Sequence, residues 1–320
     1  MTTATQTPTK TRRGPSLRTQ RVLAMILLIA QGGITVTGAT VRVTGSGLGC
    51  ETWPNCHEGS LVPVAGAAPA VHQAIEFGNR LLTFVLLAVA VAVLVAVVGA
   101  KRRNGLLTLA IISLAGIFVQ AVIGGVSVWL DLEWWAVALH FLPSMILVWV
   151  AAVLYTRLAE PDDGVRQRTF SPAARVCAVV AACALAIVLT TGTMVTGAGV
   201  HSGDAGDGMA GRLDVDIDLM AHIHAWSMYV YLAFTLITVW LLYRSRADRP
   251  AIRTGWVLVG CIVVQAAIGI AQYRMGVPRW TVPIHIGMSS VVTAFTAFLW
   301  AHGVVRFRDS ARVPAEALGR

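Results

Sequence analysis

The sequence predicts an all-α polytopic membrane protein, and three observations support this fold class. The chain of 320 residues is 56% hydrophobic and only 13% charged, whereas soluble domains carry roughly 25% charged residues. Its apolar residues gather into runs of about 20, the length at which a helix crosses a bilayer. The chain also contains an internal repeat. Together these observations predict a duplicated bundle of transmembrane helices.

Eight apolar runs define the expected helices, at 22–41, 72–99, 106–129, 135–156, 176–198, 219–242, 254–273 and 282–304. The first run follows basic residues, as the apolar core of a signal peptide does. It is too long for one, however, and a Gly-rich loop follows it in place of a small-residue cleavage site. We therefore interpret the first run as a retained helix. Basic segments follow the second, fourth, sixth and eighth runs and so mark where those helices end.

The repeat places polar residues at matched positions of the two halves. The segment Gln120–Gly124 is followed by His140, and the segment Gln265–Gly269 is followed by His285. Both matches have the same offset of 145 residues, from 120 to 265 and from 140 to 285. Polar residues inside apolar helices are costly and mark functional positions in membrane proteins.

The repeat predicts two pseudo-symmetric four-helix bundles. A second echo links Val36–Ala39 to Val195–Ala198, near the end of the first helix of each half. Because four crossings return the chain to the side on which it started, the halves share one orientation. We expect them to be related by an axis along the membrane normal, as in other parallel repeats.

The net charge of +9 is concentrated in alternate loops, so it is not a signal for nucleic acid. The positive-inside rule places loops rich in Lys and Arg in the cytoplasm. We therefore expect both termini in the cytoplasm, a multi-pass location in the cell membrane, lipid as the surrounding partner and no nucleic-acid partner. The expected division is a tail at 1–21, an N-terminal half at 22–157, a linker at 158–175, a C-terminal half at 176–304 and a tail at 305–320. Segments 1–16 and 309–320 have the composition of disordered tails.

The first outer loop, at about 42–71, contains Cys50 and Cys56, the two cysteines that lie outside the expected helices. The outer side of a bacterial membrane is oxidising, which favours a disulfide between them. Two independent thiols, or a thiol pair that cycles, are the alternatives.

Five histidines lie within about two turns of the outer ends of the even-numbered helices: His72, His140, His222, His224 and His285. A single histidine in an apolar helix is more often a packing residue, but the shared depth favours a common role. Imidazole ligates iron, and haem iron in helical bundles is commonly held by histidines from facing helices. His224 and His285 form the expected pair, with His222 as the competitor for His224. His222 and His224 are about 200° apart around a helix, so they cannot face one site.

The N-terminal half carries a different set of residues. The repeat aligns Asn79 with His224, and asparagine is a poor iron ligand. His72 lies two turns before Asn79 on nearly the same face. Glu76 and Arg80 are ionisable and spaced i, i+4, so one interpretation is a self-neutralising pair. The other is that Glu76 accepts a proton or stabilises charge at a reactive site, while Arg80 meets an anion such as a haem propionate.

Several of these motifs occur together in one known family. They are Thr44–Leu48 with Cys50 and Trp53–Pro54–x–Cys56, then Ile75–Arg80, and the histidine-bearing pairs Leu139–His140 and Ile284–His285. With the eight-span duplicated plan, this combination resembles the haem A synthase family over about residues 20–305.

The resemblance implies an enzyme that oxidises the C8 methyl group of haem O to a formyl group by successive hydroxylations. It implies a haem b cofactor on the histidines of the sixth and eighth helices, and haem O bound in the N-terminal half by His140, with His72, Asn79 and Arg80 as further site residues. The family's catalytic glutamate falls on Glu76, and its outer-loop cysteine pair falls on Cys50 and Cys56. Where the family usually has Glu-x-x-His-Arg, this chain has Asn79 in place of the histidine. The N-terminal haem iron is thus expected to be ligated by His140 alone or by His140 with His72.

Two other functions fit the same composition. A di-haem b electron carrier needs two equivalent bis-histidine sites, and Asn79 counts against it. A transporter of haem or another anion is expected to bind at the bilayer midplane, whereas these histidines lie near helix ends. For a haem A synthase we expect haem O synthase and an electron donor, which the sequence does not identify, as partners.

Overall fold

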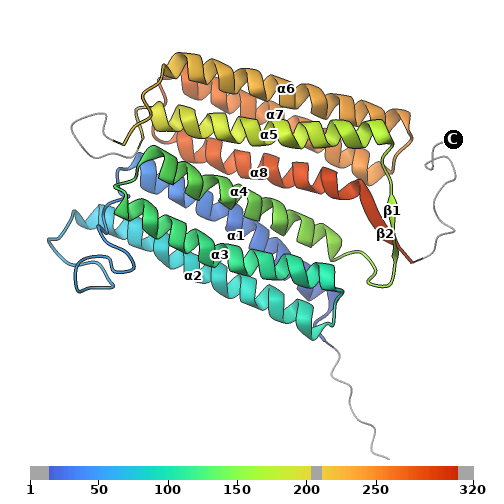
Figure 1. The fold of residues 1–320 in the computed structure, drawn as a ribbon, viewed down its shortest axis with the longest axis horizontal. Coiled ribbons are helices and arrows are strands. Elements are labelled where there is room, and N and C mark those ends of the chain that lie inside the picture. The colour runs from blue at the N-terminus through green and yellow to red at the C-terminus, as the bar shows by residue number, and fades with distance from the viewer. Residues whose placement is uncertain (1–13, 203–210, 309–320) are drawn as a thin grey trace, which may run out of the picture.

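The computed structural model describes residues 14–202 and 211–308. Most of the two expected tails, and part of the loop before the sixth helix, lie outside the described residues. The described residues include eight helices long and apolar enough to cross a membrane (Figure 1): α1 (Leu17–Val43), α2 (Ala70–Gly99), α3 (Asn104–Trp129), α4 (Trp134–Arg157), α5 (Pro172–Ala198), α6 (Ile217–Arg244), α7 (Arg249–Arg274) and α8 (Thr281–His302). The predicted all-α, eight-span fold class is therefore confirmed.

Several helices extend beyond the apolar runs because capping residues start them earlier. Helix α1 begins at Leu17, before the expected start at 22, and the Ser16 hydroxyl accepts the Thr19 N–H at 3.1 Å. Helix α5 begins at Pro172, before the expected start at 176, and the Ser171 hydroxyl accepts the Ala174 N–H at 3.3 Å. Serine caps satisfy backbone donors that the first helical turn leaves free, and proline fits that turn. Hydropathy alone does not register these polar starts.

Each half of the chain forms its own group of four helices. In the first half α1 packs on α2, α2 on α3, α3 on α4, and α4 back on α1. In the second half the contacts α5–α6, α6–α7, α7–α8 and α5–α8 repeat this ring, and Figure 1 shows the two groups as separate layers. The even-numbered helices of each half are therefore diagonal partners. Side chains that they point inward meet at the centre of their own bundle.

The two halves meet through α1, α4, α5 and α8. The Ser290 hydroxyl lies 3.7 Å from the Met145 sulfur, and these two residues are 145 positions apart, the offset of the repeat. The same hydroxyl lies 3.0 Å from that of Thr35. Contact between repeat-equivalent residues is expected on an axis that relates the halves. It supports the parallel repeat about the membrane normal, which remains a prediction.

A short antiparallel ribbon closes one end of the molecule. Strand β1 (Val165–Arg168) pairs with β2 (Val304–Phe307), so the linker between the halves is joined to the segment after α8. The sequence did not predict these strands, because four residues in each are too few to show a reliable alternation. We call this end of the bundle the strand end.

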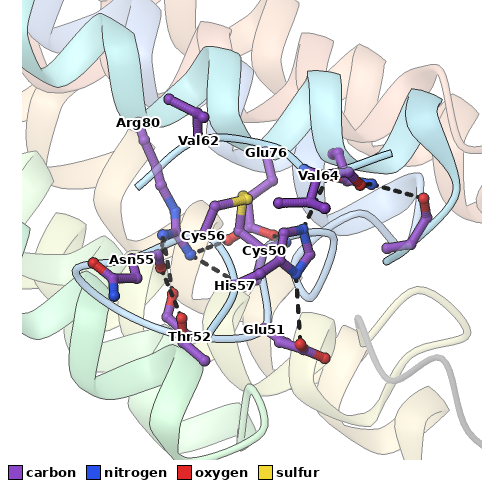
Figure 2. Close-up of a disulfide and its surroundings, with 12 residues drawn as sticks. Cys50, Glu51, Thr52, Asn55, Cys56, His57, Val62, Val64, Glu76 and Arg80 are labelled. Atoms are coloured by element: carbon purple, nitrogen blue, oxygen red, sulfur yellow. Dashed lines mark hydrogen bonds and ion pairs between the residues drawn. A yellow bond between two sulfur atoms is a disulfide. The ribbon is translucent and has the colours of Figure 1, made fainter. Parts of the chain in front are cut away.

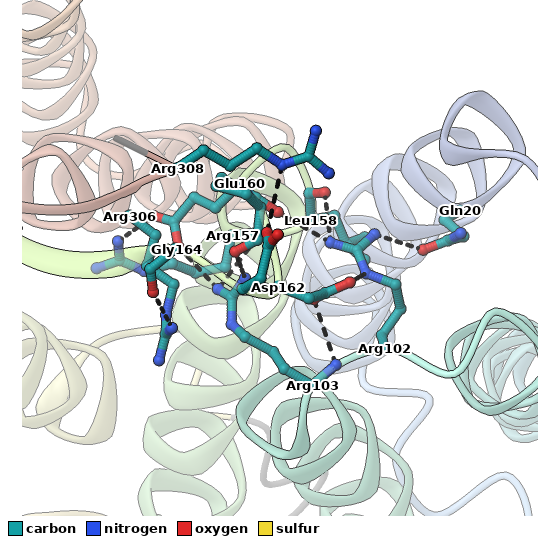
Figure 3. Close-up of polar contacts among 12 residues, drawn as sticks. Gln20, Arg102, Arg103, Arg157, Leu158, Glu160, Asp162, Gly164, Arg306 and Arg308 are labelled. Atoms are coloured by element: carbon teal, nitrogen blue, oxygen red, sulfur yellow. Dashed lines mark hydrogen bonds and ion pairs between the residues drawn. The ribbon is translucent and has the colours of Figure 1, made fainter. Parts of the chain in front are cut away.

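Ion pairs tie further loops to the strand end (Figure 3). Arg103, just before α3, lies 2.7 Å from Glu160 after α4, and Glu160 also pairs with Arg157. Arg102 pairs with Asp162 at 2.7 Å. Burial lowers the pKa of Arg103 from its usual value, and the charge of Glu160 opposes this effect. The basic residues that predict the cytoplasmic side are thus also structural residues here.

The opposite end carries the long loop between α1 and α2, in which Cys50 and Cys56 form a disulfide. The predicted bridge is present, so the two alternatives with free thiols do not describe this structure. We call this end of the bundle the disulfide end. The five histidines singled out by the sequence lie on the helical turns nearest to it.

Candidate functional site

His224 on α6 and His285 on α8 face each other inside the C-terminal bundle. Their ring centroids lie 6.4 Å apart with an interplanar angle of 60°. Both side chains come from the first turns of diagonal helices, so the bundle geometry brings them together. The structure therefore unites the two residues that the sequence pairs.

Small residues leave room for both rings. A Cβ atom at Gly192 would lie 3.1 Å from Cε1 of His224, and one at Gly269 would lie 3.1 Å from Cε1 of His285. Each glycine thus lets its helix approach an imidazole face closely. Gly269 belongs to the repeated Gln-x-x-x-Gly segment. Its close contact with the ring of His285 explains why that segment ends in glycine.

Hydrogen bonds orient the two imidazoles. Nδ1 of His224 lies 3.0 Å from the carbonyl oxygen of Val188, which can only accept, so Nδ1 carries the proton and Nε2 is left as the lone-pair nitrogen. Gln265 Nε2 lies 3.1 Å from both Nε2 and the carbonyl oxygen of His285. Nδ1 of His285 is buried and has no hydrogen-bond partner among the described residues. A carbonyl partner on Nδ1 is the usual second contact of a metal-ligating histidine.

The pair fits a haem iron. Two imidazoles that ligate one metal from opposite sides, each nitrogen about 2 Å from it, place their ring centroids roughly 6 Å apart. The observed 6.4 Å matches this spacing. Among the described residues no group of three or more His, Cys, Asp and Glu side chains forms a conventional metal site. Two imidazoles from facing helices are a donor set that suits haem, whose porphyrin supplies the remaining ligands of the iron.

His222 points away from this pair. It is exposed on the surface of α6, where Nδ1 lies 2.6 Å from the carbonyl oxygen of Asp218. His222 and His224 thus have different surroundings, and the ring contact of His224 with His285 favours His224 as the partner of His285.

In the N-terminal bundle, His140 occupies the position equivalent to His285. A Cβ atom at Gly124 would lie 3.0 Å from Cε1 of its ring, which repeats the contact between Gly269 and His285. Gln120 Nε2 donates to the His140 carbonyl oxygen at 2.8 Å, as Gln265 does to that of His285. Nδ1 of His140 is buried without a partner among the described residues. The repeated residues therefore build the same imidazole environment twice.

The partner position on α2 differs from that on α6. Asn79 accepts a hydrogen bond from the Thr37 hydroxyl at 2.7 Å. His72 lies nearer the disulfide end, where its Nδ1 is 2.8 Å from the Ser46 hydroxyl in the loop. Neither residue forms a ring contact with His140 like that between His224 and His285. The structure thus brings one bis-histidine pair together and leaves His140 without a matching histidine partner.

Glu76 and Arg80 project from α2 toward the disulfide loop (Figure 2). Glu76 is only 5% exposed; one carboxylate oxygen pairs with Arg80 at 2.6 Å and the other accepts the Cys50 N–H at 2.7 Å. Arg80 donates to the carbonyl oxygens of Thr52, Asn55 and Cys50, each at 3.0 Å. The self-neutralising pair is therefore present, and its two members also anchor the loop to α2. The role of Glu76 at a reactive site stays a prediction.

The loop contains one buried polar residue that the sequence analysis did not select. His57, next to Cys56, is 4% exposed, and its Nε2 lies 2.9 Å from Gln73 Oε1. Gln73 also bonds both backbone groups of Val64 at 2.9 Å. Glu51 lies 3.5 Å from the other ring nitrogen of His57 (Figure 2). The sequence offered one indication, the position of His57 next to a cysteine of the predicted disulfide. The internal repeat offered none, because it pairs His57 with no matching histidine.

Comparisons with known proteins point to one family. Residues 21–297 match the COX15-CtaA family model, described as cytochrome oxidase assembly protein. A haem A synthase of Listeria welshimeri is 25% identical over 291 residues, which cover 87% of this chain and 92% of that protein. A haem A synthase of Exiguobacterium sp. is 32% identical over 146 residues, 44% of each chain. The family model covers most of the chain, including His140, His224 and His285, and so the chain belongs to the COX15-CtaA family of cytochrome oxidase assembly proteins.

Proposed function

We propose that this protein is a haem A synthase that oxidises the C8 methyl group of haem O to a formyl group by successive hydroxylations. The observation that carries the proposal is the facing, half-buried pair of His224 and His285 in a chain whose relatives bear that name. The bis-histidine pair of the C-terminal bundle suits a haem that stays bound as a cofactor. The single matching histidine of the N-terminal bundle suits a haem that is exchanged as substrate and product.

In this proposal His224 and His285 hold the haem b cofactor. A haem iron supplies one-electron redox chemistry, which no side chain of this bundle provides. Val188 fixes the tautomer of His224 so that its Nε2 carries the lone pair. Gln265 holds the backbone of His285 and also contacts its Nε2 at 3.1 Å, a contact that ligation of iron through Nε2 would replace. Gly192 and Gly269 let α5 and α7 pack closely against the two imidazole rings.

The N-terminal bundle is the proposed site for haem O. His140 is the iron ligand, in the environment built by Gly124 and Gln120. Asn79 is held by Thr37 and offers no imidazole on the other side, so one iron position is open for oxidative chemistry. His72 is the alternative second ligand, and it would have to leave its hydrogen bond with Ser46.

Glu76 is proposed to handle protons or to stabilise positive charge beside the bound substrate. Its carboxylate is already desolvated and fixed by Arg80 and the Cys50 N–H, so it needs no reorganisation when substrate binds. Both terminal nitrogens of Arg80 donate to the loop or to Glu76. We therefore assign Arg80 first to holding the loop, and its contact with a haem propionate stays a prediction.

The test is haem extraction from cells that make haem O, with and without this protein. Chromatography should show haem A only when the protein is present. Accumulation of haem O alone would reject the proposal. We also propose a cell-membrane location with the disulfide end outside, and haem O synthase as the supplier of substrate.

A di-haem electron carrier has less support. It needs a second bis-histidine pair, and the described N-terminal bundle places Asn79 where the C-terminal bundle has His224.

A further inference from the structure

A polar cluster lies on the outside of the C-terminal bundle, at the disulfide end of α6 and α7. The Tyr273 hydroxyl donates to Asp218 Oδ1 at 2.8 Å, and the rings of His222 and Tyr273 stand edge to face with centroids 6.3 Å apart. All three side chains are exposed, and Tyr273 is 47% exposed. The proposed haem sites do not use any of them.

The hydrogen bonds of this cluster leave one basic nitrogen free. Nδ1 of His222 lies 2.6 Å from the Asp218 carbonyl oxygen, which can only accept. The proton of a neutral ring is therefore on Nδ1, and Nε2 keeps its lone pair. That nitrogen can accept a hydrogen bond from a hydroxyl group outside the protein. This hydrogen bond holds His222 in one tautomer, whereas an exposed histidine without such a bond has no preferred tautomer.

An apolar platform continues the cluster toward the bilayer centre. Asp218, His222 and Trp226 are spaced i, i+4, i+8 and so share one face of α6. Trp226 is 68% exposed, and Ile270 on the neighbouring α7 is 47% exposed. A ligand here therefore meets a hydrogen-bond acceptor at one end and an aromatic, lipid-facing surface at the other.

This patch lies close to the bis-histidine pair. His222 and His224 are two residues apart on nearly opposite faces of α6, so one helix width, on the order of 10 Å, separates them. The patch is thus the lipid-facing side of the same helical turn that carries a proposed iron ligand.

We propose that Asp218, His222, Trp226 and Tyr273 bind the head group of a membrane quinol, which supplies electrons to the haem b site. The ring of a quinol stacks on aromatic side chains, its hydroxyl groups need acceptors, and its isoprenoid tail requires access from lipid. The patch offers all three. This inference rests on the proposed function, because the electron acceptor is the haem of the C-terminal half.

The electrons and protons balance. A quinol that becomes a quinone releases two electrons and two protons and forms no bond to the protein. A haem held by His224 and His285 would accept these electrons one at a time, so each quinol would support two one-electron reductions. The two protons leave to water at the disulfide end.

The test uses the purified full-length protein with its haem, in detergent. An azido-benzoquinone with a decyl chain is photolysed with the protein, and the label is mapped by mass spectrometry. We expect label on peptides that contain 218–226 and 270–274, and competition by decylubiquinol. In a second measurement, the haem absorbance reports the rate of reduction by decylubiquinol and, separately, by dithionite.

Matched variants separate binding from folding. His222→Leu should slow reduction by decylubiquinol about tenfold, the effect of one lost hydrogen bond to the quinol. Tyr273→Phe should slow it to a similar extent, because it removes the hydrogen bond that positions Asp218 in the patch. Reduction by dithionite should not change. Tyr243→Phe is the control, because Tyr243 is a 71% exposed tyrosine at the other end of α6.

Unchanged rates in both variants, or label spread evenly over the lipid-facing helices, would overturn the quinol site. Failure of the proposed function looks different. In that case cells would make no haem A, while the His222 and Tyr273 variants would still differ from the wild type in haem reduction by quinol.

Discussion

At the scale of single residues, the neighbours of each histidine decide its role. His224 has a carbonyl on Nδ1, a glycine against its ring and a second imidazole opposite. His222, two residues earlier, has a carbonyl on Nδ1 but faces outward. Helical periodicity predicted that the two could not share a site. The choice between them depended on the repeat register, which aligns Asn79 with His224 and leaves His222 without a counterpart.

The first prediction concerns these ligands. His224→Ala and His285→Ala should each abolish the low-spin haem b spectrum, because either change removes one axial ligand. His222→Ala should retain that spectrum. Absorbance spectra of the reduced purified protein, with pyridine haemochrome analysis, provide the measurement. Loss of the spectrum in His222→Ala alone would show that the pair has been assigned incorrectly.

The second prediction exploits the asymmetry of the repeat. Asn79→His places an imidazole where the C-terminal half has His224, so the N-terminal haem should gain a second ligand. We expect an additional low-spin signal in the reduced spectrum and slower haem A formation, because the open iron position is closed. Asn79→Gln is the control, since it keeps an amide and should add no low-spin signal. An unchanged spectrum in Asn79→His would place the N-terminal haem away from α2.

Some residue roles could not be predicted from sequence. The i, i+4 spacing of Glu76 and Arg80 predicted that they would meet, and they do. It did not predict that Arg80 donates to three loop carbonyls, because such contacts depend on the path of the loop and not on residue type. His57 was missed for the same reason. Its burial follows from Gln73, a residue on α2 that no pattern links to it.

At the scale of elements, the loop between α1 and α2 and the first turns of α2 form one unit. Glu76 accepts a hydrogen bond from the Cys50 N–H, and Arg80 donates hydrogen bonds to three carbonyl oxygens of the loop (Figure 2). The disulfide closes the segment from Cys50 to Cys56. Closing so short a loop contributes on the order of 2 kcal/mol to its local order. The disulfide was predicted from the two cysteines. The attachment of its loop to α2 became visible only in three dimensions.

The third prediction separates the chemical role of Glu76 from its role in this unit. Glu76→Gln keeps an oxygen that can accept the Cys50 N–H but removes the negative charge. Haem A formation should fall roughly a hundredfold or more if the carboxylate handles a proton, while haem b stays bound. Glu76→Asp should be intermediate, because it keeps the charge and shortens its reach. Extracted haems and the spectrum of the purified protein are measured together.

The control for this prediction is Glu51→Gln. Glu51 is a carboxylate in the same loop, with a side chain that is 62% exposed, and its loss should leave turnover unchanged. Alkylation without reductant checks that Cys50 and Cys56 stay bridged in each variant. Normal turnover in Glu76→Gln with an intact bridge would show that the carboxylate serves only as the partner of Arg80 and the loop.

At the scale of the whole molecule, the two halves share a framework and differ in what they enclose. The repeated glutamine, glycine and histidine of α3 and α4 recur in α7 and α8 with the same contacts. Deeper in the C-terminal half, Tyr231 bonds Thr296, whereas the equivalent positions of the N-terminal half are the buried Leu86 and Ala151. A shared bundle with different interiors is what a fixed cofactor and a reactive site require.

Hydropathy and the repeat predicted this architecture because a helix in lipid must satisfy its own backbone and show an apolar surface. Those constraints fix the number of spans and their alternation. They do not specify the ends of the bundle, where water can satisfy the backbone. The β1–β2 ribbon and the ion pairs around Glu160 therefore escaped prediction (Figure 3).

The last prediction concerns how the whole bundle sits in the membrane. The strand end carries the arginines that precede α3, follow α4 and follow α8, and the positive-inside rule places that end in the cytoplasm. A fluorescent protein fused after residue 320 should therefore fluoresce, because it folds in the cytoplasm. Alkaline phosphatase inserted after Gly59, in the disulfide loop, should be active, because it requires an oxidising compartment. The same enzyme inserted after Asp163 at the strand end is the control and should be inactive. The reverse pattern would place the disulfide in a reducing compartment, where such bridges do not persist, and would reject the proposed orientation.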